Sequence, residues 1–233
     1  MGSESLFLKP QDLAALAVFV ALWVFFSLAA SGRLFSRTTL TEAMNRQREA
    51  WMQTMSRREL RMIDTGIMAG LQQGTAFFAS TCIFAIGGCL ALLGASEQVM
   101  IVLGDLPFGT VTSRGEFEFK VLGLVVILAY AFFKFGWAYR LFNYCSILIG
   151  AVPVIKDDGL DGKDIAAAVA RAARMNVLGG RHFNAGLRGI FFSIGYLGWF
   201  VGPLVLVATT LFVFVVLVRR QFFSEARLAV TGS

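Results

Sequence analysis

The residue with the most distinctive chemistry in this sequence is Lys134, a cation within the long apolar stretch from Leu124 to Pro153. A charge inside such a helix costs about 2.5–3.5 kcal/mol on membrane-insertion scales, so it usually faces a bundle interior or a wet cavity. Tyr130 and Trp137 lie one helical turn to either side and could hold the ammonium by cation–π contacts. We expect a polar cluster near the inner membrane edge that comprises Lys134, Gln72, Gln73, Asp64, Arg140 and Asn143.

This predicted cluster has two interpretations. As a functional site, it would hold an anion or a polar substrate. As a structural feature, Lys134 would extend its four-carbon stem toward the membrane surface and pair with neighbouring polar groups. The structural interpretation is the simpler one.

A second candidate site is the segment "HFNAGLRG", which places His182, Asn184 and Arg188 at the expected start of a helix. A half-exposed helix N-terminus with arginine and amide donors suits an anionic group. One histidine alone makes neither a metal site nor a catalytic triad. Hydrogen bonding at the membrane interface is therefore the simpler interpretation of His182.

The sequence lacks the pieces of a catalytic centre. Its three cysteines, Cys82, Cys89 and Cys145, all fall in apolar segments without metal-binding spacing. It contains no HExxH motif, no CxxC motif and no nucleophile–His–acid set. We therefore expect a non-enzymatic protein with no metal and no cofactor.

The elements that position these residues are four predicted membrane spans. Apolar residues make up 57% of the 233 positions, and the mean hydropathy is +0.69, whereas soluble domains are about 45–50% apolar. A bilayer core about 30 Å thick needs roughly 20 apolar residues per helix. Four segments meet that requirement: Leu13–Ser31, Ile67–Gly94, Phe119–Phe142 and Leu187–Val218. The pattern predicts a single all-α membrane domain built as a four-helix bundle.

Most of the 21 lysines and arginines lie in two connections, residues 33–64 and 143–186. The positive-inside rule places both connections in the cytoplasm and therefore both termini outside it. Arg219 and Arg220, directly after the fourth span, fit that orientation poorly. Because the basic residues flank apolar runs, the net charge of +6 indicates an inner-membrane protein rather than a nucleic-acid partner.

Both cytoplasmic connections are predicted to contain helices. In the first, Thr38 or Thr41 could cap a helix whose apolar residues recur at helical spacing: Leu40, Met44, Trp51, Met55 and Met62. This helix could lie on anionic lipid headgroups through Arg46, Arg57 and Arg58, or it could pack its methionine face on the protein. In the second connection, Asp164 is the expected N-cap, and Gly179 with Gly180 is the expected helix end.

Glycines recur at helical spacing in the second and fourth predicted spans: Gly66, Gly70, Gly74, Gly195, Gly198 and Gly202. Because glycine has no side chain, helices with glycine at such positions can approach each other closely and gain dispersion contact within lipid. The pattern predicts close packing of these two spans within one chain, with a homo-oligomer interface as the alternative.

Three long segments resemble a known family. They are "FFASTCIFAIGGCLALLGA" from Phe77 to Ala95, "FKFGWAYRLFNYCSILIGAVP" from Phe133 to Pro153, and "HFNAGLRGIFF" from His182 to Phe192. Together they are similar to the bacterial and plant membrane-protein family of domain of unknown function 599, and the resemblance covers nearly the whole chain. It implies a membrane protein of four helices and brings no established activity or site residue with it.

Two functions remain open on this sequence. An oligomeric channel or transporter for a small anion or metabolite would use the basic polar cluster, and four spans would require several subunits for a pore. A non-enzymatic scaffold or assembly partner of a larger membrane complex would instead use the cytoplasmic amphipathic helix. We slightly prefer transport.

Overall fold

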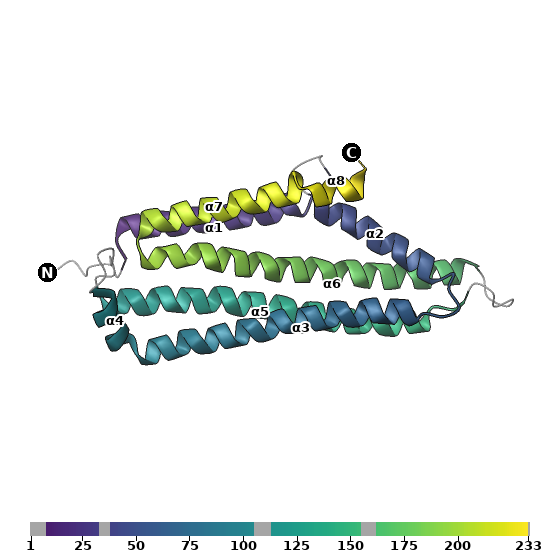
Figure 1. The fold of residues 1–233 in the computed structure, drawn as a ribbon, viewed down its shortest axis with the longest axis horizontal. Helices are drawn as coiled ribbons and strands as arrows, with labels where there is room; N and C mark the ends of the chain where they lie inside the picture. The colour runs from purple at the N-terminus through teal and green to yellow at the C-terminus, as the bar shows by residue number, and fades with distance from the viewer. Residues whose placement is uncertain (1–7, 33–37, 105–112, 155–161, 233) are drawn as a thin grey trace.

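The computed structural model describes residues 8–32, 38–104, 113–154 and 162–232. Every regular element in these ranges is a helix, which confirms the expected all-α class (Figure 1). In chain order the elements are α1 (Pro10–Ala30), α2 (Leu40–Met55), α3 (Met62–Gly94), α4 (Ser96–Gly104), α5 (Arg114–Ala151), α6 (Gly162–Tyr196), the 3-10 helix η1 (Leu197–Phe200), α7 (Pro203–Phe222) and α8 (Glu225–Thr231).

Four helical segments are long and apolar enough to cross a membrane, as the sequence predicted. They are Pro10–Ala30, Met62–Gly94, Arg114–Ala151 and Pro203–Thr231, with best-window mean hydropathies between 2.0 and 2.5. The protein is therefore an all-α integral membrane protein.

The expected fourth span, Leu187–Val218, is not one helix. Its first part belongs to α6, which ends at Tyr196, and α7 begins only at Pro203. Pro203 has no backbone N–H and cannot continue a helix, but it suits a first helical position. The Thr209 hydroxyl donates a hydrogen bond of 2.6 Å to the Gly195 carbonyl, which compensates for the broken helix.

Gly179 and Gly180 do not end a helix either, because α6 runs through both. A Cβ added at Gly179 would lie 2.7 Å from the Phe142 ring, and one at Gly186 would lie 2.7 Å from Phe135. These glycines therefore permit a close approach of α6 to α5. A single sequence does not distinguish that role from a helix stop.

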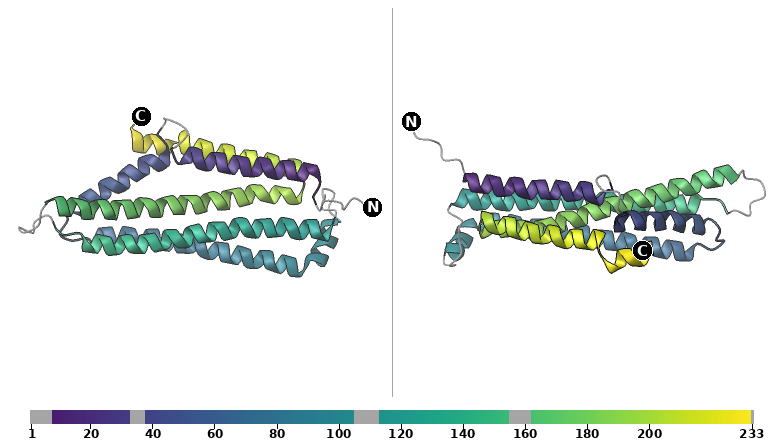
Figure 2. Two further views of the ribbon diagram at one scale, coloured as in Figure 1. Left: turned by 180° about the vertical axis from the view of Figure 1, so that it is seen from behind. Right: turned by 90° about the horizontal axis from the view of Figure 1, so that it is seen from above.

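Three long helices, α3, α5 and α6, have 33, 38 and 35 residues, so each is roughly 50–57 Å long. The shorter α1 and α7 have 21 and 20 residues and reach about 30 Å. Figures 1 and 2 show α1 and α7 together along one half of the long helices, with α2 along the other half.

Helices α1 and α7 run in the same direction. Asp12, near the start of α1, accepts a hydrogen bond from Trp199 just before α7, and Phe26 packs on Phe214 further along both helices. The start of α1 and the end of α7 therefore lie at opposite ends of this helix pair (Figure 1).

Helix α2 packs its methionine face on the protein. Met52 and Met55 are fully buried in a cluster that includes Phe142 of α5 and Val169 of α6. The N-cap is Thr39, whose hydroxyl accepts from the Glu42 amide, rather than Thr38 or Thr41.

The expected packing of the second span on the fourth is not met within one chain. No atom lies within 4 Å of a Cβ added at Gly66, Gly70 or Gly74. Gly195 and Gly198 instead contact α7, around Thr209 and Thr210.

Candidate functional site

The structure does not bring the six residues of the predicted Lys134 cluster together. Asp64 is fully buried at the start of α3. Its carboxylate accepts hydrogen bonds of 2.7 Å from the Trp51 indole and 2.6 Å from Arg58. Asp64 therefore joins α2 to α3 and makes no contact with Lys134.

The other members of that cluster also have separate partners. Gln72 donates to the Ser146 hydroxyl at 3.0 Å, and Arg140 donates to the Tyr144 hydroxyl at 2.5 Å. Gln73 is exposed and Asn143 is half-buried. These four residues do not converge on one cavity.

Lys134 contacts Tyr130, one of its two expected aromatic partners, but lies at a different depth from Gln72. Its ammonium is 5.2 Å from the centre of the Tyr130 ring. The neighbouring Phe135 stacks on Phe78 of α3, six residues beyond Gln72. At 1.5 Å per residue, this separates the lysine from the level of Gln72 by about 9 Å.

The second predicted site divides into two parts. The His182 ring contacts Trp137 of α5, with 6.4 Å between ring centres. Asn184 and Arg188, one turn apart, line a different cavity. Because all three residues lie in the interior of α6, none of them is at a helix N-terminus.

That cavity, which we name the basic pocket, has a volume of about 190 Å³ and lies where the ends of α1 and α7 meet α2 and α6. Its polar lining comprises Thr41, Asn45 and Arg48 of α2, Asn184 and Arg188 of α6, and Arg220 and Gln221 of α7. Apolar residues, among them Phe26 and Phe191, complete the wall.

Local contacts hold several of these side chains in place. Arg48 donates a hydrogen bond of 2.5 Å to the Asn176 side chain, and Gln221 donates one of 2.8 Å to Thr41. The Arg220 guanidinium lies over the Phe191 ring at 5.7 Å. The pocket is therefore assembled by four helices, and its polar side chains come from α2, α6 and α7.

The basic pocket contains three arginines and no carboxylate. Among the described residues, the ion pairs involve Arg46, Arg58, Arg114 and Lys120 but none of these three arginines. The Nε atom of Arg188 is buried and has no hydrogen-bond partner among the described residues. Burial lowers the pKa of Arg48, against an opposing effect of the nearby Cys145. Arg48 and Arg188 are half-buried, whereas Arg220 is exposed. Partly desolvated cations without a counter-charge favour an anionic ligand.

Sequence reasoning found Asn184 and Arg188 but missed Arg48 and Arg220. Arg48 lies in the first basic connection, for which the sequence predicts an amphipathic helix and no site, and the expected orientation puts Arg220 on the opposite side of the membrane. The poor fit of Arg219 and Arg220 to the expected orientation was the available signal.

The opposite end of the bundle holds a second set of buried charges. The Lys120 ammonium lies 2.7 Å from the Glu116 carboxylate and over the Trp199 ring at 5.4 Å. Trp199 also donates a hydrogen bond of 2.6 Å to Asp12. Lys120 and Glu116 therefore form an ion pair within the chain, and the buried Asp12 carboxylate is held by the indole N–H of Trp199.

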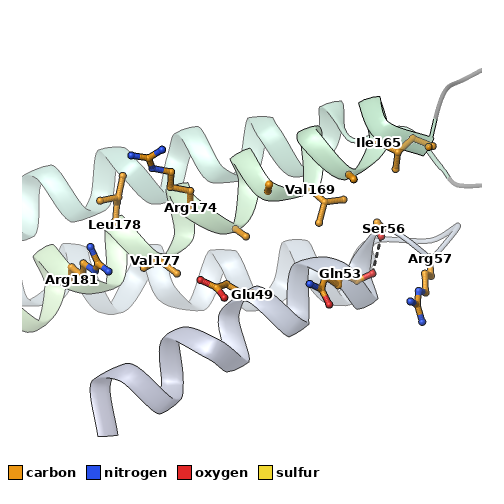
Figure 3. A pocket seen from close by; sticks show the side chains of 14 residues that line it. Glu49, Gln53, Ser56, Arg57, Ile165, Val169, Arg174, Val177, Leu178 and Arg181 are labelled. Atoms are coloured by element: carbon orange, nitrogen blue, oxygen red, sulfur yellow. Dashed lines mark hydrogen bonds between the residues drawn. The ribbon is translucent and has the colours of Figure 1, made fainter. Parts of the chain in front are cut away.

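A larger hollow, the α2–α6 groove, has a volume of about 780 Å³ (Figure 3). Its lining from α2 and the turn after it consists of Glu49, Gln53, Ser56 and Arg57. The α6 lining includes Ile165, Val169, Ala173 and Val177 with Arg174 and Arg181. Among the described residues, no group of three or more His, Cys, Asp or Glu is placed to hold a metal ion.

These features define the class of protein: an integral membrane protein of long helices with a basic pocket between them. A family described as "Protein of unknown function, DUF599" matches residues 14–226, so the chain belongs to that family. No curated protein and no solved structure matches this chain.

Proposed function

We propose that this DUF599 protein binds a small anion in the basic pocket at the inner edge of the cytoplasmic membrane, as a subunit of a non-enzymatic channel or transporter. The observation that carries this proposal is the group of three arginines without a carboxylate in their pocket. A buried cation without a partner is costly, and an anion that accepts hydrogen bonds from Arg188 and its neighbours would offset that cost.

A topology of five crossings supports this location. In this proposal the second half of α6 crosses the membrane beside α1 and α7, although its arginine makes it less apolar than the other spans. The N-terminus then lies outside and the C-terminus inside. Arg219, Arg220 and Arg227 join the arginine-rich cytoplasmic side, in agreement with the positive-inside rule.

Cysteine labelling tests this topology. In Gly232→Cys, an impermeant maleimide should react only after the membrane is permeabilised, because α7 would end in the cytoplasm. The native cysteines Cys82, Cys89 and Cys145 are buried and give a low background. Labelling of intact cells at position 232 would contradict the proposal.

Anion binding is tested with purified protein in nanodiscs. Phosphate, sulfate and chloride are titrated while thermal unfolding is followed, since a ligand that binds only the folded state raises its stability. Arg188→Gln should abolish the anion-dependent rise. The control is Arg171→Gln, which changes an exposed arginine of α6 outside the pocket. An equal response of both variants would refute the site.

Transport requires an oligomer in this proposal, and α3 offers the surface. Its Gly66, Gly70 and Gly74 have no atom within 4 Å of an added Cβ, and Phe77 and Phe84 are strongly exposed. Proteoliposomes should release the stabilising anion, and the Gly70→Leu variant should be monomeric and inactive. Anion binding without release would restrict the function to binding.

The scaffold function remains a second candidate, favoured by the α2–α6 groove. Its size and its position on the cytoplasmic half of α6 suit a protein partner better than a small molecule.

A further inference from the structure

We infer that the α2–α6 groove docks an amphipathic helical segment of a partner protein that carries acidic residues beside its apolar face. This inference goes beyond anion binding and concerns a different part of the molecule. It uses only the proposed position of the inner membrane edge.

The floor of the groove matches the length of a short helix. Ile165, Val169, Ala173 and Val177 recur every four residues along α6 and are 7–8% exposed, so they form the base of the groove and the exposed residues beside them provide its contact surface. Figure 3 shows Ile165, Val169 and Val177 on the side toward α2. The line covers 12 residue steps, or about 18 Å, which corresponds to three helical turns. An amphipathic helix presents its apolar side chains at the same spacing.

Small side chains beside this floor permit a close approach. Ala166 and Ala170 line the groove and are exposed. An alanine surface lets a second helix lie nearer than the larger residues of α6 would allow. The groove therefore allows the backbone of a second helix to pack closely against α6.

The groove lies beyond the reach of lipid. Arg188 marks the inner membrane edge in the proposed topology, and Val177 precedes it by 11 residues, or about 16 Å along α6. Ile165 is about 35 Å away on the same scale. The occupant is accordingly a water-exposed segment rather than an acyl chain or a headgroup.

Charge on the rim indicates what kind of segment fits. Arg57, Arg174 and Arg181 line the groove and are exposed, and Glu49 is the one acidic lining residue in the part of the chain that the structure describes. None of the three arginines has an ion-pair partner among the described residues. Arg174 and Arg181 are two turns apart, about 10 Å. Carboxylates seven residues apart on a partner helix would face both.

A second copy of this chain is a poor occupant. The chain has a net charge of +6, and arginines dominate its cytoplasmic connections. Two such surfaces would repel each other at the arginine rim. Charge complementarity therefore favours an acidic partner protein.

Site-specific photo-crosslinking in native membranes tests the inference. A photoreactive diazirine side chain replaces Ala170 in the groove or, as a control, Ala167, which is exposed on α6 outside it. Mass spectrometry then identifies the crosslinked peptide. We expect adducts from position 170 only, with an amphipathic peptide that carries acidic residues about seven apart.

Charge reversal supplies the second arm. The double variant Arg174→Glu/Arg181→Glu should reduce the adduct at least tenfold, whereas Arg171→Glu should leave it unchanged. The unfolding temperatures of both variants in anion-free buffer should match that of the unmodified protein, which shows that they are folded and keeps this test separate from the anion proposal. A peptide of this same chain, a lipid adduct, equal yields at 167 and 170, or no adduct would overturn the inference.

Discussion

The two ends of the membrane region differ in how they compensate buried charge. At the outer end of the proposed topology, Lys120 pairs with Glu116 at 2.7 Å, and Asp12 accepts from Trp199. At the inner end, Arg48 and Arg188 line a pocket that has no carboxylate. Both ends enclose charged side chains, but among the described residues only the outer one holds an ion pair from its own chain.

This difference separates a structural role from a binding role. A buried ion pair with its hydrogen bonds made is complete, and removal of one partner leaves an uncompensated charge. Arg48 and Arg188 are half-buried and form no ion pair among the described residues, so they carry part of that cost already in the native protein. They are explained if a ligand supplies the missing negative charge. The outer cluster should therefore respond to mutation through stability, and the basic pocket should respond through ligand binding.

The largest effect is expected at the outer end. Lys120→Met removes the ammonium that lies 2.7 Å from the buried Glu116 carboxylate. This should destabilise the protein by about 3–5 kcal/mol, as is usual when one member of a buried ion pair is removed. Thermal unfolding of the purified protein in detergent measures the loss.

The double variant Lys120→Met/Glu116→Gln is the control for this prediction. It removes both charges and should recover a large part of the lost stability, because no uncompensated ion remains. If the double variant is as unstable as the sum of the two single variants, the pair does not act as a unit and the comparison fails.

The sequence predicted the all-α class, the family and three of the spans because long apolar runs are decisive on their own. It did not predict the break between α6 and α7, since the residues from Leu187 to Val218 are apolar almost throughout. The local signal was Gly202 followed by Pro203, the pair at which α7 begins. In the proposed topology, that break adds a fifth crossing and places the C-terminus in the cytoplasm.

The candidate site was predicted only in part for a related reason. Arg188 could be found because it interrupts an apolar helix. Arg48 and Arg220 reach the same pocket only because α2 crosses α6 and α7 returns beside α1, and a single sequence contains no measure of such tertiary contacts. The Lys134 cluster does not form for another reason. Gln72 lies beside Ser146 and Phe78 lies beside Phe135, so Gln72 and Lys134 are at different depths. A sequence alone does not fix the relative depth of residues on two helices.

In the basic pocket, mutation is expected to weaken anion binding while leaving the stability of the anion-free protein intact, in contrast to Lys120→Met. Without added anion, Arg188→Gln should leave the unfolding temperature unchanged or raise it, because an unpaired buried charge is removed. With the best anion from the titration, the variant should bind at least tenfold more weakly, which corresponds to about 1.4 kcal/mol. A strong loss of stability in anion-free buffer would instead assign Arg188 to the same structural class as Lys120.

The smallest change in stability is expected at the exposed ion pair of Arg46 and Glu42. These residues are one turn apart on α2, with 3.2 Å between their charged groups. Arg46→Gln should cost about 0.3–0.5 kcal/mol, as is usual for such helix pairs. Added salt screens exposed charges strongly and buried ones weakly, so 0.5 M sodium chloride should cancel this cost while the defect of Lys120→Met persists. Unfolding curves with and without salt therefore rank the three positions. A salt-sensitive Lys120 defect would mean that water reaches the outer pair, and the contrast between the two ends would then rest on the basic pocket alone.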